Sequence, residues 1–148
     1  MKSVYSDKLK DYTDGFSALG AGVSFPVGAI IVDNEKIKNV SAFFKKKNIP
    51  VIKADKTIHP DIILGKVFQS VLNKKTAVLD ISQGLAPKII THLENLSQNF
   101  IDVKLAQDTE RMIFPNIPVG SKLLLVMNND DYENILMPDV ISSVCRLE

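Results

Sequence analysis

The stretch AVLDISQGLAPKI, Ala77 to Ile89, joins an apolar run to a helical pattern through a short polar turn. The run TAVLDI, Thr76 to Ile81, predicts a strand buried on both faces, as in a parallel sheet that helices cover on each side. After the turn, apolar residues recur at helical spacing from Leu85 to Leu96, which predicts a helix. The stretch therefore predicts one β–α unit of a parallel sheet.

Further strand and helix patterns flank this unit on both sides. Upstream, PDIILGKVFQSVLN, residues 60–73, carries two adjacent apolar stripes, which are typical of a helix packed on a sheet. Pro60 fits its first turn, and His59 or Thr57 is the expected capping neighbour. Downstream, the expected elements are a strand at residues 100–105, a short helix near 108–113, a strand at 122–127, a turn at 128–131 and a final helix interrupted at Pro138.

The first third of the chain shows a different pattern. Residues 2–14 suit a short helix or a covering arm. VSFPVGAIIVD and IKNVSAFF, residues 23–33 and 37–44, are expected to be two strands, with turn residues Asp33-Asn34 between them. Another short strand is expected at Val51–Ala54. The sequence thus predicts three strands before any long helix.

This element order predicts an α/β fold with an antiparallel three-strand meander followed by alternating helices and strands, the ribonuclease H-like or actin-like arrangement. A doubly wound, flavodoxin-like sheet is the alternative. The expected domain is single and spans residues 1–146. It is interpreted as the N-terminal cytoplasmic domain of a longer protein, because Leu147 and Glu148 match a common cloning scar.

Composition restricts the function classes. The net charge of +1 over 148 residues provides no global field to hold a polyanion, so nucleic acid is not expected. The single Cys145 cannot form an internal disulfide, which predicts a reducing, cytoplasmic environment. The longest apolar runs are shorter than the roughly 20 residues of a membrane-spanning helix. Any membrane contact is expected through a segment outside this sequence.

The turn at Asp80–Gly84 resembles a nucleophile elbow, in which Gly-x-Ser-x-Gly exposes a catalytic serine. Here Asp80 stands where the first glycine belongs, and the only later histidine, His92, lies ten residues beyond Ser82. Ten helical residues span about 15 Å, so His92 cannot serve Ser82 in the same chain. No catalytic residue is predicted, and an enzyme using Ser82 or Asp80 would need residues from another subunit.

The same turn also invites a phosphate-binding hypothesis. The glycine patterns of phosphate and dinucleotide loops are absent from the sequence, although any helix N-terminus attracts anions. Ser82 is therefore expected to cap the following helix, with Pro87 in its first turn. The alternative site for a nucleotide or small ligand consists of Asp80, Ser82 and Gly84, and no cofactor is predicted.

Other polar residues favour structural roles. His59 and Asp61 lie two apart, as metal ligands can, but no His or Cys pair has ligand spacing, so no metal site is predicted. Cys145 is expected to be a small buried hydrophobic side chain rather than a reactive thiol. The run Lys45–Lys47 is expected to form a solvated loop, because only Phe43 and Phe44 accompany it as stacking residues.

Three stretches support a resemblance to a known family: GAIIVDNEKIKNVSAFF, PDIILGKVFQSVLN and TAVLDISQG. Their order resembles the actin-like cytoplasmic domains of inner-membrane assembly proteins of type IV pili, of the bundle-forming type, and of type II secretion systems. Actin-like ATPases carry Asp-x-Gly phosphate turns, but LDISQG has Ser82 in place of the first glycine, and the early strands offer no Asp-Gly-Thr turn.

The resemblance implies a degenerate actin-like half that has lost its nucleotide. In that family the domain is followed by one membrane-spanning helix and docks other assembly proteins, including the assembly ATPase. The expected function is thus a non-catalytic scaffold in a pilus or secretion complex at the cytoplasmic face of the inner membrane. The alternative is a nucleotide- or small-ligand-binding α/β domain. Oligomeric state and partner identity do not follow from the sequence.

Overall fold

Five parallel strands form the centre of the molecule. The computed structural model describes residues 2–17, 26–98, 100–103, 112–114, 117, 121–134, 141 and 143–147. The strands of the sheet are β1 (Val27–Val32), β2 (Val51–Lys53), β3 (Thr76–Asp80), β6 (Lys122–Met127) and β7 (Ser143–Leu147). They lie in the order β2-β3-β6-β1-β7, and each neighbouring pair is parallel.

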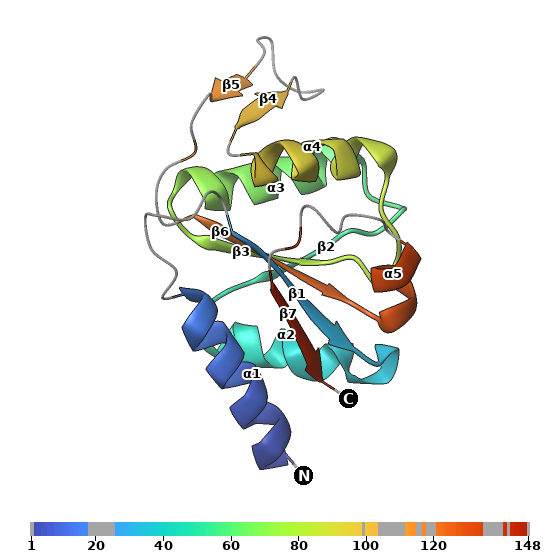
Figure 1. Ribbon diagram of the computed structural model, residues 1–148. Helices are drawn as coiled ribbons and strands as arrows, with labels where there is room; N and C mark the ends of the chain where they lie inside the picture. The colour runs from blue at the N-terminus through green and yellow to red at the C-terminus, as the bar shows by residue number, and fades with distance from the viewer. Residues whose placement is uncertain are drawn as a thin grey trace.

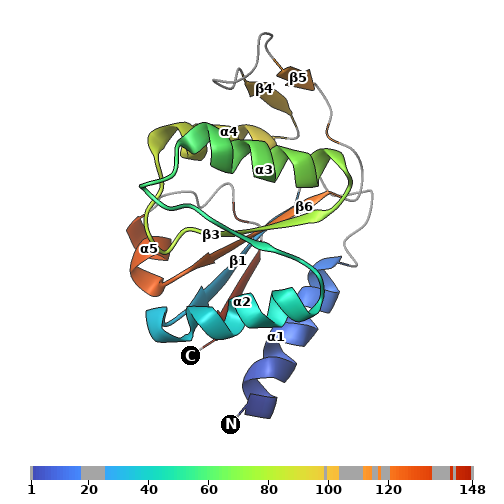
Figure 2. The ribbon, with the colours of Figure 1, turned by 180° about the vertical axis from the view of Figure 1, so that it is seen from behind.

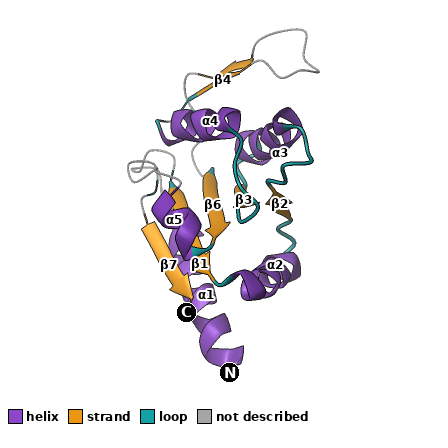
Figure 3. Ribbon diagram, turned by 90° about the vertical axis from the view of Figure 1, so that its right-hand side faces the viewer, coloured by secondary structure: helices purple, strands orange, loops and turns teal. Residues whose placement is uncertain are grey.

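Helices cover both faces of this sheet (Figure 1). They are α1 (Lys2–Ser17), α2 (Ile37–Lys46), α3 (Pro60–Leu72), α4 (Pro87–Ser97) and the short α5 (Asn129–Asn134), with a 3-10 turn η1 (Asn34–Lys36) before α2. Figures 1 and 3 show α3 and α4 above the sheet and α1 and α2 below it. The result is three layers, helices–sheet–helices.

Alternation along each strand divides the core between the two faces. On β6, Leu123 and Leu125 belong to the cluster under α3 and α4, whereas Leu124 and Val126 belong to the cluster over α1 and α2. All six residues of β6 are buried. The near-continuous apolar strand patterns follow from this double coverage, because a parallel strand in the middle layer exposes neither face to water.

The fold class predicted first, an antiparallel meander of the ribonuclease H-like or actin-like type, is wrong. Residues 37–46, expected to be mainly strand, form the helix α2, which carries β1 across to a parallel β2. The buried residues of α2 are Ile37, Val40 and Phe44, a helical i, i+3, i+7 spacing. The structure is instead a doubly wound parallel sheet of the flavodoxin or Rossmann kind.

Several local predictions are confirmed. Helix α3 begins at Pro60, with His59 as its N-cap, and the His59 Nδ1 accepts a hydrogen bond of 3.1 Å from the Asp61 N–H. Strands β3 and β6 lie where the apolar runs placed them, and β2 covers Val51–Lys53 of the strand expected at Val51–Ala54. Pro87 occupies the first turn of α4.

Other local predictions are wrong. Residues 129–134, expected to begin within a turn, form α5, because Asn128 caps it reciprocally: its Oδ1 accepts from the Asp131 N–H at 2.7 Å, and its own N–H donates to Asp131 at 3.4 Å. Residues 143–147 form β7 rather than a final helix. The break expected at Pro138 lies outside the described residues.

A small antiparallel ribbon lies outside the main sheet. It consists of β4 (Ile101–Val103) and β5 (Met112–Phe114), and Figure 1 shows it beyond α4. The strand predicted at residues 100–105 is confirmed over β4. The short helix predicted near residues 108–113 is wrong for 112 and 113, which belong to β5, and 108–111 lie outside the described residues.

Candidate functional site

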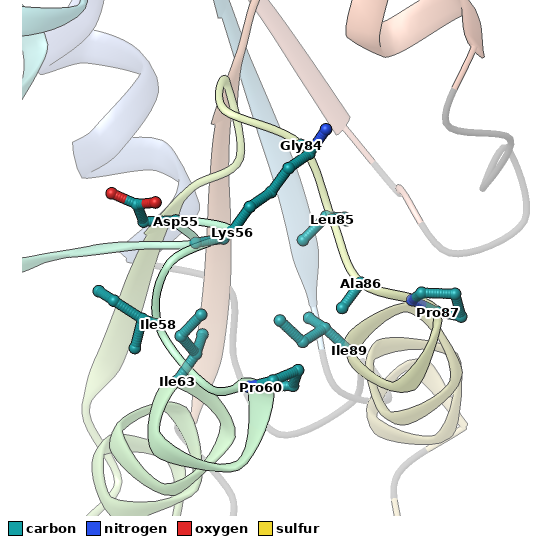
Figure 4. Close-up of a pocket in the computed structure, with 11 residues that line it drawn as sticks. Asp55, Lys56, Ile58, Pro60, Ile63, Gly84, Leu85, Ala86, Pro87 and Ile89 are labelled. Atoms are coloured by element: carbon teal, nitrogen blue, oxygen red, sulfur yellow. The ribbon is translucent and has the colours of Figure 1, made fainter.

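A pocket of about 280 Å³ opens at the carboxyl ends of β2 and β3. Its walls are the turn from β2 to α3, the turn from β3 to α4, and the first turns of both helices (Figure 4). The lining residues are Ala54, Asp55, Lys56, Ile58, Pro60, Ile63, Gly84, Leu85, Ala86, Pro87 and Ile89. In doubly wound sheets, ligands bind at this carboxyl edge.

The turn after β2 presents a lysine to the pocket. The Asp55 Oδ1 accepts hydrogen bonds of 2.9 Å from both the N–H and the hydroxyl of Thr57, which folds the chain tightly around Lys56. The same bonds lower the pKa of the Asp55 carboxyl, so this residue is ionised at neutral pH. Figure 4 shows the Asp55 carboxylate and the Lys56 ammonium on opposite sides of the pocket.

Gly84 lets the lysine stem cross the opposite turn. Its φ of +103° is a conformation that side chains rarely adopt. A Cβ at this position would also lie 2.7 Å from Lys56 Cε. Figure 4 shows the extended Lys56 side chain running over Gly84. The glycine therefore serves both the turn and the placement of the lysine along the pocket rim.

The two helix N-termini beside the pocket offer little to a phosphate group. Pro60 and Pro87, in the first turns of α3 and α4, have no N–H. The next N–H of α3, from Asp61, already donates to His59, and the Ile89 and Ile90 N–H groups both donate to the Ala86 carbonyl. A backbone phosphate cradle needs several free N–H groups, and the first turns of these two helices offer few of them.

Asp80 and Ser82, the other two residues of the predicted alternative site, stabilise the turn between β3 and α4. The Asp80 Oδ1 accepts hydrogen bonds from the Ser82 N–H at 2.9 Å and from the Ser82 hydroxyl at 2.6 Å. Asp80 is 4% exposed, and neither residue lines the pocket. The expectation that Ser82 caps α4 is wrong: its N-cap is Ala86, without a side-chain bond. Of the three predicted residues, Gly84 alone lines the pocket.

The topological switch point lies next to the pocket, between the ends of β1 and β6. Helix α2 leads from β1 to one face, whereas Tyr132 of α5, after β6, packs into the core of the other face. Here Asn128 Nδ2 donates to Asn34 Oδ1 at 2.9 Å. Burial raises the pKa of the Asp131 carboxyl, and the nearby Asp80 charge acts in the same direction. This hydrogen bond joins the two strand ends at the position where many doubly wound domains bind ligands.

An ion pair connects the two helices that flank the pocket. Lys88 of α4 donates to the Asp61 carboxylate of α3. The Asp61 side chain is 4% exposed, and the lysine is 39% exposed. His59 and Asp61, considered above as metal ligands, are thus used in a helix cap and an ion pair. Across the described residues, no group of three or more His, Cys, Asp or Glu side chains is placed to hold a metal ion.

His92 packs against the neighbouring helix α3. It lies on α4 with its ring edge-on to Phe68 of α3, at 6.2 Å between centroids. Its Nδ1 is buried and finds no hydrogen-bond partner among the described residues. Burial lowers the pKa of His92, and Lys88 adds to this effect, while Asp102 and Asp61 oppose it. The ring is consequently held neutral between the helices.

Acidification is expected to destabilise the protein partly through His92. Its pKa is lower in the folded than in the unfolded chain, so the unfolded state binds more protons as pH falls below about 6.5. Stability should fall between about pH 7 and pH 5. Urea denaturation at both pH values should show a smaller loss for His92→Gln than for the wild type. An equal loss in both proteins would contradict this role.

Cys145 is buried, as predicted, on the α1 side of β7. Burial raises the pKa of its thiol, which disfavours the reactive thiolate. The lysine that reaches the pocket, Lys56, was missed by sequence reasoning. The segment Asp55-Lys56-Thr57 did indicate a turn, because an Asp side chain often accepts a hydrogen bond from the backbone N–H two residues further on. Only the pairing of β2 with β3 brings this turn to Gly84.

Comparisons with known proteins leave the family open: no protein-family model matches the chain, and no curated protein matches it. The resemblance to pilus and secretion assembly domains therefore stays a prediction, while the actin-like fold it implied is wrong. Among the described helices, none is both long and apolar enough to cross a membrane.

Proposed function

We propose that this domain binds a small organic anion with a mainly apolar body, in the pocket between the β2–α3 and β3–α4 turns. The supporting observation is the composition of the pocket wall, where apolar side chains predominate and the Lys56 ammonium lies at the rim. Small-molecule sites commonly combine an apolar wall with a few polar groups that orient the ligand.

The charges at the rim favour an anion. Lys56 is exposed, and among the described residues no carboxylate lies within ion-pair distance of it. Asp55, the acid beside it in sequence, is held by Thr57 on the other side of the pocket. A ligand carboxylate could therefore meet the lysine while its apolar part contacts Ile58, Ile63 and Ile89.

The pocket suits a compact ligand better than a nucleotide. Its volume of about 280 Å³ is just below the range of typical small-molecule sites, which span roughly 300–1,000 Å³. The first turns of α3 and α4 also present few free N–H groups to a phosphate chain, because each begins with a proline and most of the following N–H groups are already hydrogen-bonded. The docking role inferred from the family resemblance rested on an actin-like fold, so the ligand-binding alternative has the better support.

The test is a titration with small carboxylates, followed by NMR of isoleucine methyl groups. Benzoate and 4-methylpentanoate are expected to shift the signals of Ile58, Ile63 and Ile89. Lys56→Gln should weaken binding about fivefold, since an exposed charge pair contributes up to about 1 kcal/mol. Ala86→Leu, which fills the pocket, should abolish binding.

Lys66→Gln is the matched control, because Lys66 is an exposed lysine of α3 that does not line the pocket. It should bind like the wild type. Binding of ATP or GTP but neither carboxylate would exclude the proposed ligand class. Carboxylate binding that survives Ala86→Leu would exclude the pocket itself.

A further inference from the structure

Exposed lysines gather on two turns at the amino edge of the sheet, opposite the pocket. Lys45 and Lys46 end α2, and Lys74 and Lys75 follow α3; all four are exposed. Residues 45–50 and 73–75 contain five lysines and no acidic residue. A lysine near a helix C-terminus interacts favourably with the helix dipole. This effect alone does not explain five lysines on two adjacent turns.

The strand register places these turns next to one another. Val51 of β2 pairs with Val78 of β3, so the segments that precede the two strands start from the same edge of the sheet. Figure 2 shows both turns at the right-hand end of the molecule, one from each helical layer, with the pocket turns at the left-hand end. The four lysines, Lys45, Lys46, Lys74 and Lys75, are called the amino-edge lysines below.

One of these lysines occupies a backbone position that favours glycine. Lys74 has φ 59°, in the left-handed region, at the end of α3. Its N–H donates to the Val71 carbonyl and the Lys75 N–H donates to the Ser70 carbonyl, a helix-ending arrangement where glycine is commonest. The equivalent residue after α2 is Asn48, with φ 62°, and Asn tolerates this conformation better. Local stability therefore does not account for a lysine at position 74.

The neighbouring Lys47 has a different role. Its ammonium lies 3.7 Å from an Asp14 oxygen of α1 and 4.9 Å from the centre of the Phe43 ring. These contacts connect α2 to α1. Lys47 therefore stabilises the packing of α2 on α1, and it is not counted among the amino-edge lysines.

The chemistry of this surface fits a flat and diffuse anionic partner. The charges are lysine ammonium groups on long stems, without arginine forks for bidentate recognition. No aromatic residue on either turn could stack on a base. A negatively charged membrane surface attracts clustered basic residues by about 1 kcal/mol, or about fivefold in binding, for each lysine near it. We propose that the amino-edge lysines dock this domain on a membrane surface that contains anionic lipids, with the pocket facing away from the membrane.

The test measures co-sedimentation with vesicles of phosphatidylcholine alone, or with roughly 30% phosphatidylserine, at about 0.1 M salt. The wild type should bind the anionic vesicles only, and about 0.5 M salt should release it. Each lysine is expected to raise the partition coefficient about fivefold. The variant Lys45→Gln/Lys46→Gln/Lys74→Gln/Lys75→Gln should consequently lose at least about a hundredfold in binding.

The matched control is Lys8→Gln/Lys38→Gln/Lys53→Gln/Lys66→Gln, four exposed lysines away from the two turns. Neutralising four lysines takes the net charge from +1 to −3 in either variant, so only their location differs. The control should lose less than about tenfold, and circular dichroism should show both variants folded. Equal losses in the two variants would overturn the proposal. So would binding of duplex DNA or polyglutamate by a protein that does not bind anionic vesicles.

Discussion

Replacing Gly28 with valine is expected to destabilise the protein by about 3 kcal/mol or more, the upper end for overpacked cores. Gly28 lies on β1, on the face of the sheet that packs against α1. A Cβ there would lie 2.3 Å from the Tyr12 hydroxyl oxygen, and 2.9 Å from both Phe16 Cε1 and Leu124 Cδ2. Tyr12 is also held by a 2.7 Å hydrogen bond to the Ser143 hydroxyl. Relieving these steric clashes would therefore require α1 to move away from the sheet.

Gly15→Ala is the matched control. Gly15 lies within α1, and a Cβ there would meet nothing within 4 Å. Because glycine lowers helix stability by up to about 1 kcal/mol relative to alanine, this change should be stabilising. Urea denaturation followed by circular dichroism measures both variants. A Gly28→Val protein within about 0.5 kcal/mol of wild type would show that α1 does not pack closely on β1.

Phe44→Ala and Phe68→Ala are each expected to cost about 3–5 kcal/mol. Phe44 of α2 and Phe68 of α3 are 0% and 2% exposed, and they fill the clusters on opposite faces of the sheet. A domain is stable by only about 5–15 kcal/mol, so either change alone should bring the protein close to unfolding. Denaturant unfolding of each variant gives the loss directly.

Phe43→Ala provides the comparison within the same helix. Phe43 is half-buried and packs at the edge of the cluster that contains Phe44. Phe43→Ala should therefore lower the free energy of unfolding by about 1–2 kcal/mol less than Phe44→Ala does. Equal costs at the two positions would mean that α2 does not present the face seen in the structure.

The elements predicted best from sequence are those whose pattern is long or doubly buried. Helix α3 shows two apolar stripes over residues 60–73, and β6 is apolar throughout. Helix α2 was missed because Phe43 and Phe44 are adjacent, which weakens the helical period, and because Asp33-Asn34 resembles a hairpin turn. That turn instead leads through η1 into α2.

The order of the strands in the sheet could not be predicted from local sequence patterns. Nothing in VGAIIV specifies that β1 lies between β6 and β7, the last two strands that the structure describes. Strand β7 itself gives little signal, because it has only five residues and its exposed Val144 is apolar, so apolar and polar residues do not alternate along it. Taking residues 37–44 as a strand then made the first pairings antiparallel, and the fold class followed from that error.

The candidate site, too, could be predicted from the sequence only in part. Gly84 could be singled out from its own turn, because a glycine between strand and helix often marks a required backbone conformation. Lys56 belongs to a different β–α turn, and its relation to Gly84 depends on the pairing of two parallel strands. Local sequence gives turn chemistry, whereas the assembly of a pocket from two turns is a property of the sheet.

The position of β1 has a consequence for synthesis of the protein. On the ribosome β1 emerges well before β6 and β7, its partners on both sides. Such distant pairings are slow to form. Until then VGAIIV, all of which is buried in the folded state, remains an apolar segment without a partner and prone to aggregation. Nascent chains stalled before β6 should therefore depend on chaperones more than the completed protein does.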